Sequence, residues 1–155
     1  MRTRIQSCLL VACIAFLSPV GGAEVQKANV TTSLNQAASW VSGGPPGAAD
    51  VAVWDAQVTS TTTYTLGGSV GWAGLKVVSP ALDQTIRPTT GLSLTLGSAG
   101  VDMAAATKNF AANATVLLGA NQEWNIGAGR TLSTQGLTGS SGFTLTKTGE
   151  GILSL

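Results

Sequence analysis

Residues 136–155 read GLTGSSGFTLTKTGEGILSL and carry the clearest structural signal in the chain. Within them, Phe143–Thr146 and Ile152–Leu155 mostly alternate apolar and polar side chains, which is typical of half-buried β-strands. Residues 149–151, Gly-Glu-Gly, lie between the two segments, and glycine adopts positive φ without a Cβ clash. The stretch therefore predicts two short strands joined by one tight turn.

The same pattern of short apolar segments, closed by glycine or proline, recurs upstream. Further candidate strands lie at 51–54, 61–66, 70–79, 85–87, 92–96, 101–103, 115–118, 122–126 and 130–133. Short strands separated by frequent turn residues predict an all-β fold. A β-sandwich satisfies this pattern, but small residues and threonines recur at the turns, as they do where equivalent corners stack. This favours a β-solenoid with coils near twenty residues.

Residues 145–155, LTKTGEGILSL, resemble the autotransporter-associated β-strand repeat, whose core reads approximately L-x-K-x-G-x-G-x-L-x-L. The matching positions after the first leucine are Lys147, Gly149, Gly151, Leu153 and Leu155. Residues 40–54 more weakly resemble a segment near the start of such proteins, with a tryptophan, a Gly/Pro loop and Ala-Asp before a strand. The resemblance implies a right-handed parallel β-helix in an exported passenger region, here as an N-terminal or truncated member.

Residues 1–23 have the layout of a secretory signal peptide. Two arginines precede an apolar run over 8–17, which is too short for a membrane-spanning helix, and small residues lead to a predicted cleavage site after Ala23. A minority alternative is a lipoprotein anchored at Cys13, because the preceding residues resemble a lipobox. The sequence thus predicts an exported protein, either secreted or associated with the cell surface or outer membrane.

Three regions follow from these signals. Residues 1–23 form the signal peptide, and 24–50 form a leader and N-terminal cap region that contains a Gly-Gly-Pro-Pro-Gly loop. Residues 51–155 form the solenoid, which ends in an incomplete autotransporter-associated repeat over 137–155. Because a final strand at Leu155 exposes unpaired N–H and C=O groups, we expect downstream repeats or self-association through this open C-terminal edge.

Composition bears on the function classes. The net charge is +1, so no basic field attracts nucleic acid, and we expect no nucleic-acid partner. Histidine is absent, which removes the commonest general base and metal ligand. No residue cluster predicts a cofactor or metal, and we expect no catalytic activity.

Three functional hypotheses follow. The first is a structural or adhesive passenger segment at the bacterial cell surface, which contacts a surface glycan or a host or matrix partner. The second is a carbohydrate-binding module that uses exposed tryptophans, namely Trp40, Trp54, Trp72 and Trp124. For Trp40 and Trp54 we favour a cap that covers one end of the β-stack. The third, less favoured, is a β-helical polysaccharide-cleaving enzyme that uses Arg87, Arg130 and nearby acids.

Overall fold

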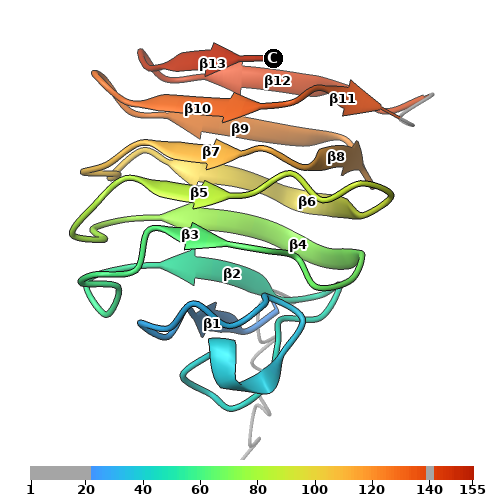
Figure 1. The fold of residues 1–155 in the computed structure, drawn as a ribbon. Coiled ribbons are helices and arrows are strands. Elements are labelled where there is room, and N and C mark those ends of the chain that lie inside the picture. Colours follow the sequence, from blue (N-terminus) through green and yellow to red (C-terminus); the bar gives the residue numbers. More distant parts are fainter. Residues whose placement is uncertain (1–21, 139–141) are drawn as a thin grey trace, which may run out of the picture.

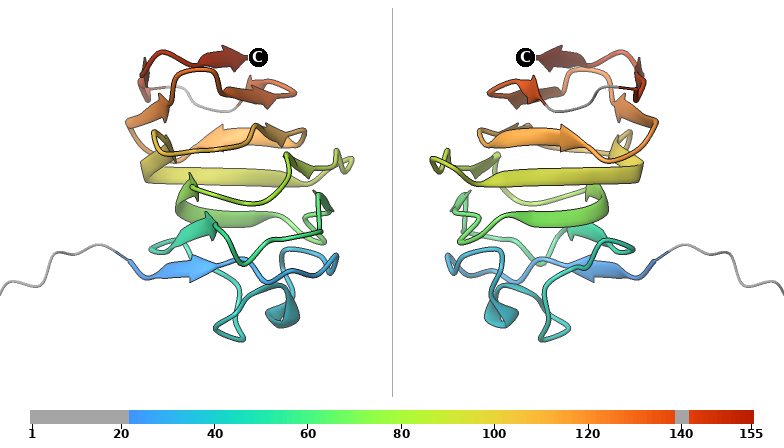
Figure 2. Two further views of the ribbon diagram at one scale, coloured as in Figure 1. Left: turned by 90° about the vertical axis from the view of Figure 1, so that its left-hand side faces the viewer. Right: turned by 90° about the vertical axis from the view of Figure 1, so that its right-hand side faces the viewer.

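The computed structural model describes residues 22–138 and 142–155 and shows a right-handed parallel β-solenoid of about six turns (Figure 1). This confirms the predicted all-β solenoid. The apolar run of the predicted signal peptide and the lipidation alternative at Cys13 lie outside the described residues. Successive coils stack in chain order from one end of the molecule to the other, as the two side views show (Figure 2).

The strands belong to two parallel sheets. The larger sheet contains β1 (Glu24–Gln26), β2 (Val51–Trp54), β4 (Val70–Val77), β6 (Ser93–Met103), β8 (Thr115–Leu118), β9 (Gln122–Ile126), β11 (Leu137–Thr138) and β12 (Leu145–Thr148). The smaller sheet contains β3 (Thr63–Tyr64), β5 (Gln84–Ile86), β7 (Phe110–Ala112), β10 (Thr131–Thr134) and β13 (Ile152–Ser154). Each ladder pairs strands from successive coils, which excludes the sandwich alternative.

The coils are longer and less regular than the predicted twenty residues. Glu24 pairs with Val51, whereas Thr131 pairs with Ile152, so one coil takes between 21 and 27 residues. The lengths vary because loops of different size connect strands that keep the same register. A ragged sequence period is therefore compatible with a regular ladder.

Several predicted strand boundaries are wrong. The strand expected over Phe143–Thr146 is β12, which spans Leu145–Thr148, and the one expected over 61–66 is the shorter β3. Segments 92–96 and 101–103, expected as separate strands, form the single strand β6. Its first half pairs with β8 and its second half with β9, and its pairing with β4 shifts register beside Ala73. The glycine-rich middle of β6 bends the strand around a corner of the coil without interrupting the ladder.

The core consists of inward side chains that stack from coil to coil. One row, set by the register of the larger sheet, runs Val25, Ala52, Leu75, Val101 and Trp124. All five side chains are buried, and this row continues the alternation that the sequence showed. Each coil therefore rests on the apolar layer of the coil before it.

Candidate functional site

The four tryptophans lie inside the solenoid, each at most 2% exposed. The ring centroid of Trp54 lies 5.8 Å from that of Trp40, 6.0 Å from that of Trp72 and 5.1 Å from that of Phe110. Most of these pairs are edge-to-face, the geometry that aromatic rings favour in packed interiors. Trp124 is held separately, since its Nε1 donates to Gln122 Oε1 at 2.8 Å.

A sugar-stacking platform requires exposed ring faces, and the structure presents none of these four rings to solvent. The expectation that these four tryptophans are exposed is therefore wrong, and all four are core residues. Sequence reasoning missed this because an indole in a strand can face either side. The signal that was available is alternation, since Ala52 and Trp54 occupy inward positions of the same strand.

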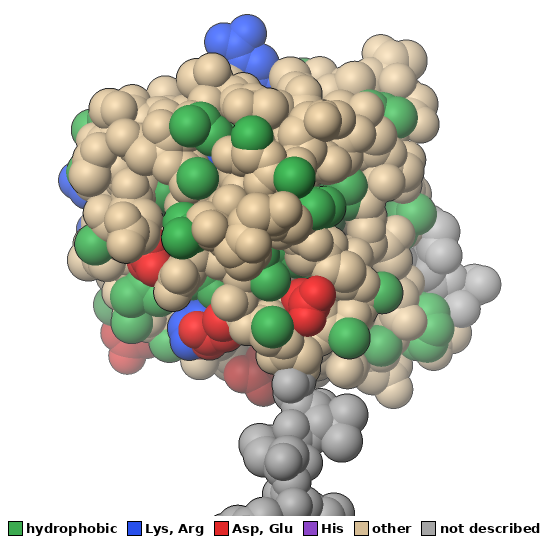
Figure 3. All heavy atoms as spheres, turned by 90° about the horizontal axis from the view of Figure 1, so that it is seen from below, with side chains coloured by type: hydrophobic (Ala, Val, Ile, Leu, Met, Phe, Trp, Pro, Cys, Tyr) green, Lys and Arg blue, Asp and Glu red, His purple; other side chains and the backbone are tan. Residues whose placement is uncertain are grey.

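The segment between β1 and β2 covers the first coil. It contains the short helix η1 (Ala37–Ser39), which lies below β1 (Figure 1). Trp40 forms an isolated antiparallel bridge with Lys27, and its indole Nε1 donates to the carbonyl oxygen of Leu34 at 2.8 Å. Viewed from below, this end is a filled surface of mostly uncharged side chains (Figure 3).

Lys27 is a buried cation at this closed end and was not anticipated from the sequence. Its side chain has no exposed surface, and its Nζ donates to the carbonyl oxygens of Ala28 at 2.7 Å and Val30 at 2.9 Å. Burial lowers the pKa of Lys27 to about 8, because desolvation disfavours the charged form. Alternation with Val25 is the only sequence signal that marks it as inward.

Tyr64 lies beside this lysine. Its hydroxyl donates to Gln84 Oε1 at 2.6 Å and to the carbonyl oxygen of Thr61 at 3.2 Å. Burial raises the pKa of Tyr64 to about 12, since the phenolate is the form that desolvation disfavours. Two titratable groups with shifted pKa values thus face each other, but both are sealed from solvent and serve the packing of the closed end.

The repeat motif lies on the last coil. Lys147 pairs in register with Trp124 and so continues an inward row, while its Nζ donates to the carbonyl oxygens of Thr148 at 3.2 Å and Gly149 at 2.6 Å. The motif lysine therefore holds the corner that follows β12. Lys27 holds the corner after β1 in the same way, with carbonyls of the residues that follow it.

The two motif glycines permit this corner to lie on the coil beneath it. Gly149 has a φ of +71°, and a Cβ there would collide with the carbonyl oxygen of Ile126. A Cβ at Gly151 would collide with the Ile126 side chain and would lie 2.7 Å from the carbonyl oxygen of Arg130. Both glycines are required by close contact between successive coils, not only by the turn itself.

The remaining motif residues lie on the outer edge of the solenoid. Leu153 is partly buried, whereas Ile152 is 63% and Leu155 67% exposed. Within the described part of the chain, β13 pairs only with β10 and β12 only with β9.

The residues of the enzyme hypothesis do not converge. Arg87 follows the C-terminal end of β5, whereas Arg130 precedes the N-terminal end of β10. Both strands belong to the smaller parallel sheet, so the two arginines lie at opposite ends of its strands. Arg130 donates from Nη1 to the carbonyl oxygen of Thr107 at 2.8 Å. Among the described residues, no three acids, cysteines or histidines form a metal-binding group. The structure therefore does not bring Arg87 and Arg130 together at one point.

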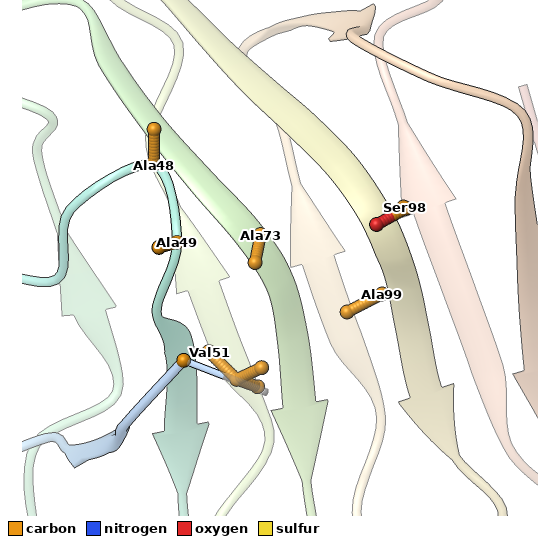
Figure 4. A pocket seen from close by; sticks show the side chains of 7 residues that line it. Ala48, Ala49, Val51, Ala73, Ser98 and Ala99 are labelled. Atoms are coloured by element: carbon orange, nitrogen blue, oxygen red, sulfur yellow. The ribbon is translucent and has the colours of Figure 1, made fainter. Parts of the chain in front are cut away.

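A surface hollow of about 250 Å³ lies where the N-terminal part of the chain meets β4 and β6 (Figure 4). Its lining is small and uncharged, and it consists of Gly22, Ala48, Ala49, Val51, Ala73, Ser98 and Ala99. Such a lining supplies no group for acid–base or metal chemistry. It reflects the close approach of successive corners.

Comparison with protein-family models, with curated proteins and with solved structures found no match. No helix within 22–138 or 142–155 has the length and hydropathy to span a membrane.

Proposed function

We propose that the chain is an exported structural or adhesive passenger segment at the bacterial cell surface, of the autotransporter-associated repeat type. The observation that supports this most is the parallel ladder of stacked coils, whose first coil is covered by the segment between β1 and β2. A β-stack of this kind forms an extended body and leaves its outward side chains available for contact.

The stack supplies the mechanical basis for this role. Inward rows bury apolar surface in every coil, at roughly 25 cal/mol for each Å² removed from water. Polar side chains add links between coils, as where Asp83 accepts from the backbone N–H of Asn109 at 2.9 Å. Asn109 in turn accepts from the backbone N–H of Thr131 at 3.0 Å. Rigidity thus comes from packing and a continuous ladder.

An adhesive contact would use the outward side chains, since the aromatic rings are inside. The outward face of the smaller sheet carries a row of mostly small polar residues, set by the register Thr63, Thr85, Ala111 and Ser133. Hydroxyl groups of this kind suit hydrogen bonding to a surface glycan or to a matrix protein. The proposed partner class is therefore one that binds a flat, weakly charged surface.

The test is export and protease resistance of the full chain in a Gram-negative host. We expect an extracytoplasmic product whose first residue is Glu24 and which resists proteinase K as one unit. A matched variant, Leu75→Asp, places a charge in the buried row and should be exported but degraded. Retention of the uncleaved chain in the cytoplasm would contradict export. Degradation of the wild-type chain at the rate of the variant would contradict the structural role.

A further inference from the structure

The outward side of the smaller sheet carries two open hollows that lie side by side. The first, of about 280 Å³, is lined by Thr31, Thr63, Tyr64, Thr65 and Arg87. The second, of about 380 Å³, has a lining that includes Asp83, Thr85, Asn109, Thr131 and Ser133. Thr63 of the first hollow pairs in register with Thr85 of the second. The hollows therefore form one track across the stacked strands β3, β5, β7 and β10 (Figure 1).

Arg87 supplies an unpaired cation in the first hollow. Its side chain is exposed, and among the described residues its guanidinium group forms no hydrogen bond or ion pair. The larger sheet differs, because Lys76 there contacts the carboxylate of Glu24 at 2.7 Å. A planar guanidinium group binds a carboxylate through two parallel hydrogen bonds. The first hollow, with threonine hydroxyls beside Arg87, therefore fits a carboxylate.

The second hollow offers hydroxyl groups instead of a cation. The side chains of Thr85, Thr131 and Ser133 are partly buried, and within 22–138 and 142–155 their hydroxyls have no hydrogen-bond partner. Each hydroxyl both donates and accepts, as the hydroxyls of a sugar do. Asp83 at the edge of this hollow accepts from the backbone N–H and side-chain amide of Asn109 at 2.9 and 3.2 Å. Its negative charge disfavours a second carboxylate here, so a neutral sugar suits the hollow.

The topology and lining of this face favour a glycan over other partners. β5 pairs with both β3 and β7, and β7 with both β5 and β10, so no peptide strand can be added between them. The large apolar residues of the two linings, Tyr64 and Phe110, are each 1% exposed and cannot anchor a protein surface. One unpaired arginine is too little positive charge for a nucleic-acid backbone.

We propose that this face binds a linear acidic glycan in which carboxylated and neutral sugars alternate, with a carboxylate at Arg87 and the adjacent neutral sugar in the second hollow. Alternation follows from the sheet, because Arg87 and Asp83 lie four residues apart along one strand, roughly 13 Å at about 3.3 Å per residue. The inference rests on the adhesive form of the function proposed above and names its ligand class. The site lies on strands inside the stack.

Isothermal titration calorimetry of the full chain with a hyaluronan octasaccharide tests this proposal, since that polymer alternates a carboxylated and a neutral sugar. The matched probe is the same octasaccharide with its carboxyl groups reduced to alcohols. We expect the reduced octasaccharide to bind with a dissociation constant at least tenfold higher. Undetectable binding of hyaluronan, or equal binding of the two octasaccharides, would overturn the proposal.

Variants of the two cations locate the carboxylate. Arg87→Gln should raise the dissociation constant for hyaluronan at least tenfold, and Arg87→Lys should give an intermediate value because it keeps the charge but loses the two-point contact. The matched control is Lys76→Gln, which removes the same charge from the larger sheet and should bind as the wild type does. All variants should retain the wild-type circular dichroism. Equal weakening by Arg87→Gln and Lys76→Gln would mean that net charge alone explains the binding, and the proposal would fall.

A third variant tests the second hollow. Thr85→Val removes one hydroxyl at nearly constant shape and should weaken hyaluronan binding by about threefold to tenfold, as expected for one hydrogen bond. An unchanged dissociation constant would contradict the placement of the neutral sugar. An octaglutamate peptide that binds more tightly than the octasaccharide would replace the glycan with an acidic protein partner.

This proposal and the proposed function fail separately. A chain that is exported and resists protease but does not bind hyaluronan would remove the glycan and leave the structural role. A chain that binds hyaluronan through Arg87 but is digested as fast as Leu75→Asp would remove the structural role and leave the binding site.

Discussion

Lys27 Nζ lies 4.4 Å from the centroid of the Tyr64 ring, inside the closed end of the solenoid. The ring face attracts the ammonium group, and the two carbonyl oxygens that accept from Nζ offset part of its desolvation. The contact joins the residue after β1 to β3, two coils of the stack, and so ties the covering segment to the core. The same contact keeps a cation buried at neutral pH, and the desolvation of that cation lowers the stability of the folded protein.

That cost predicts how stability varies with pH. The pKa of Lys27 is about 8 in the folded protein against 10.5 in the unfolded chain, so between these values the unfolded chain binds more protons. The free energy of unfolding should therefore rise from about pH 8, by up to about 1.4 kcal/mol for each pH unit. Tyr64 has the opposite sign, because its pKa rises from 10.0 to about 12, and stability should fall above pH 10.

Urea unfolding followed by circular dichroism between pH 7 and 11 checks this prediction. Lys27→Met should remove the rise between pH 8 and 10. Tyr64→Phe should reduce the decline above pH 10, and a smaller decline should remain because the hydrogen bond to Glu24 raises the pKa of Lys76. Lys108 lies outside this contact, so Lys108→Met serves as the control and should retain both the rise and the decline in stability. A wild-type curve that declines steadily from pH 8 would show that Lys27 is solvated.

The buried tryptophans predict weak quenching of fluorescence by acrylamide in the native state and strong quenching in urea. Trp54→Ala should lower the free energy of unfolding by about 3–5 kcal/mol, because it removes the ring that contacts Trp40, Trp72 and Phe110. Strong quenching of the native protein would place rings at the surface and restore the sugar-stacking hypothesis.

Asn29 links the covering segment to the loop before β3. Its Oδ1 accepts from the backbone N–H groups of Thr59 at 3.2 Å, Ser60 at 3.1 Å and Thr61 at 3.1 Å. Asn29→Ala should therefore lower the free energy of unfolding by about 1–2 kcal/mol. Asn29→Asp keeps the acceptor and should lose less in the same urea titration. An equal loss in both variants would show that the hydrogen bonds donated by the amide nitrogen Nδ2, and not those accepted by Oδ1, carry the interaction.

Sequence periodicity predicted the strands where alternation was unbroken. Segments 115–118 and 122–126 coincide with β8 and β9, because each is closed by a turn residue on both sides. It failed at β6, where Gly97 and Gly100 indicated a turn. In a solenoid these glycines instead allow one strand to pass a corner, since a Cβ at Gly100 would collide with the carbonyl oxygen of Glu123 in the next coil.

The direction of side chains was less predictable than the strands. Alternation places Trp54 on the same side of its strand as Ala52, but contacts between residues distant in sequence decide which side faces the core. The burial of Lys27 likewise depends on Tyr64, which lies far along the chain. Local sequence patterns do not predict contacts between residues that are distant in sequence. The turn at Gly149 was more predictable, because its positive φ of +71° is a local property of the backbone that favours glycine.

The motif glycines give the sharpest test of coil stacking. Gly149 and Gly129 both have positive φ, +71° and +69°, but a Cβ at Gly129 meets nothing within 4 Å. Gly129→Ala should therefore cost only the backbone strain, about 1–2 kcal/mol. Gly149→Ala adds the collision with Ile126 and should cost about 1–3 kcal/mol more in urea unfolding. Equal losses would mean that the last coil does not lie on the one beneath it, because the same backbone conformation would then explain both variants.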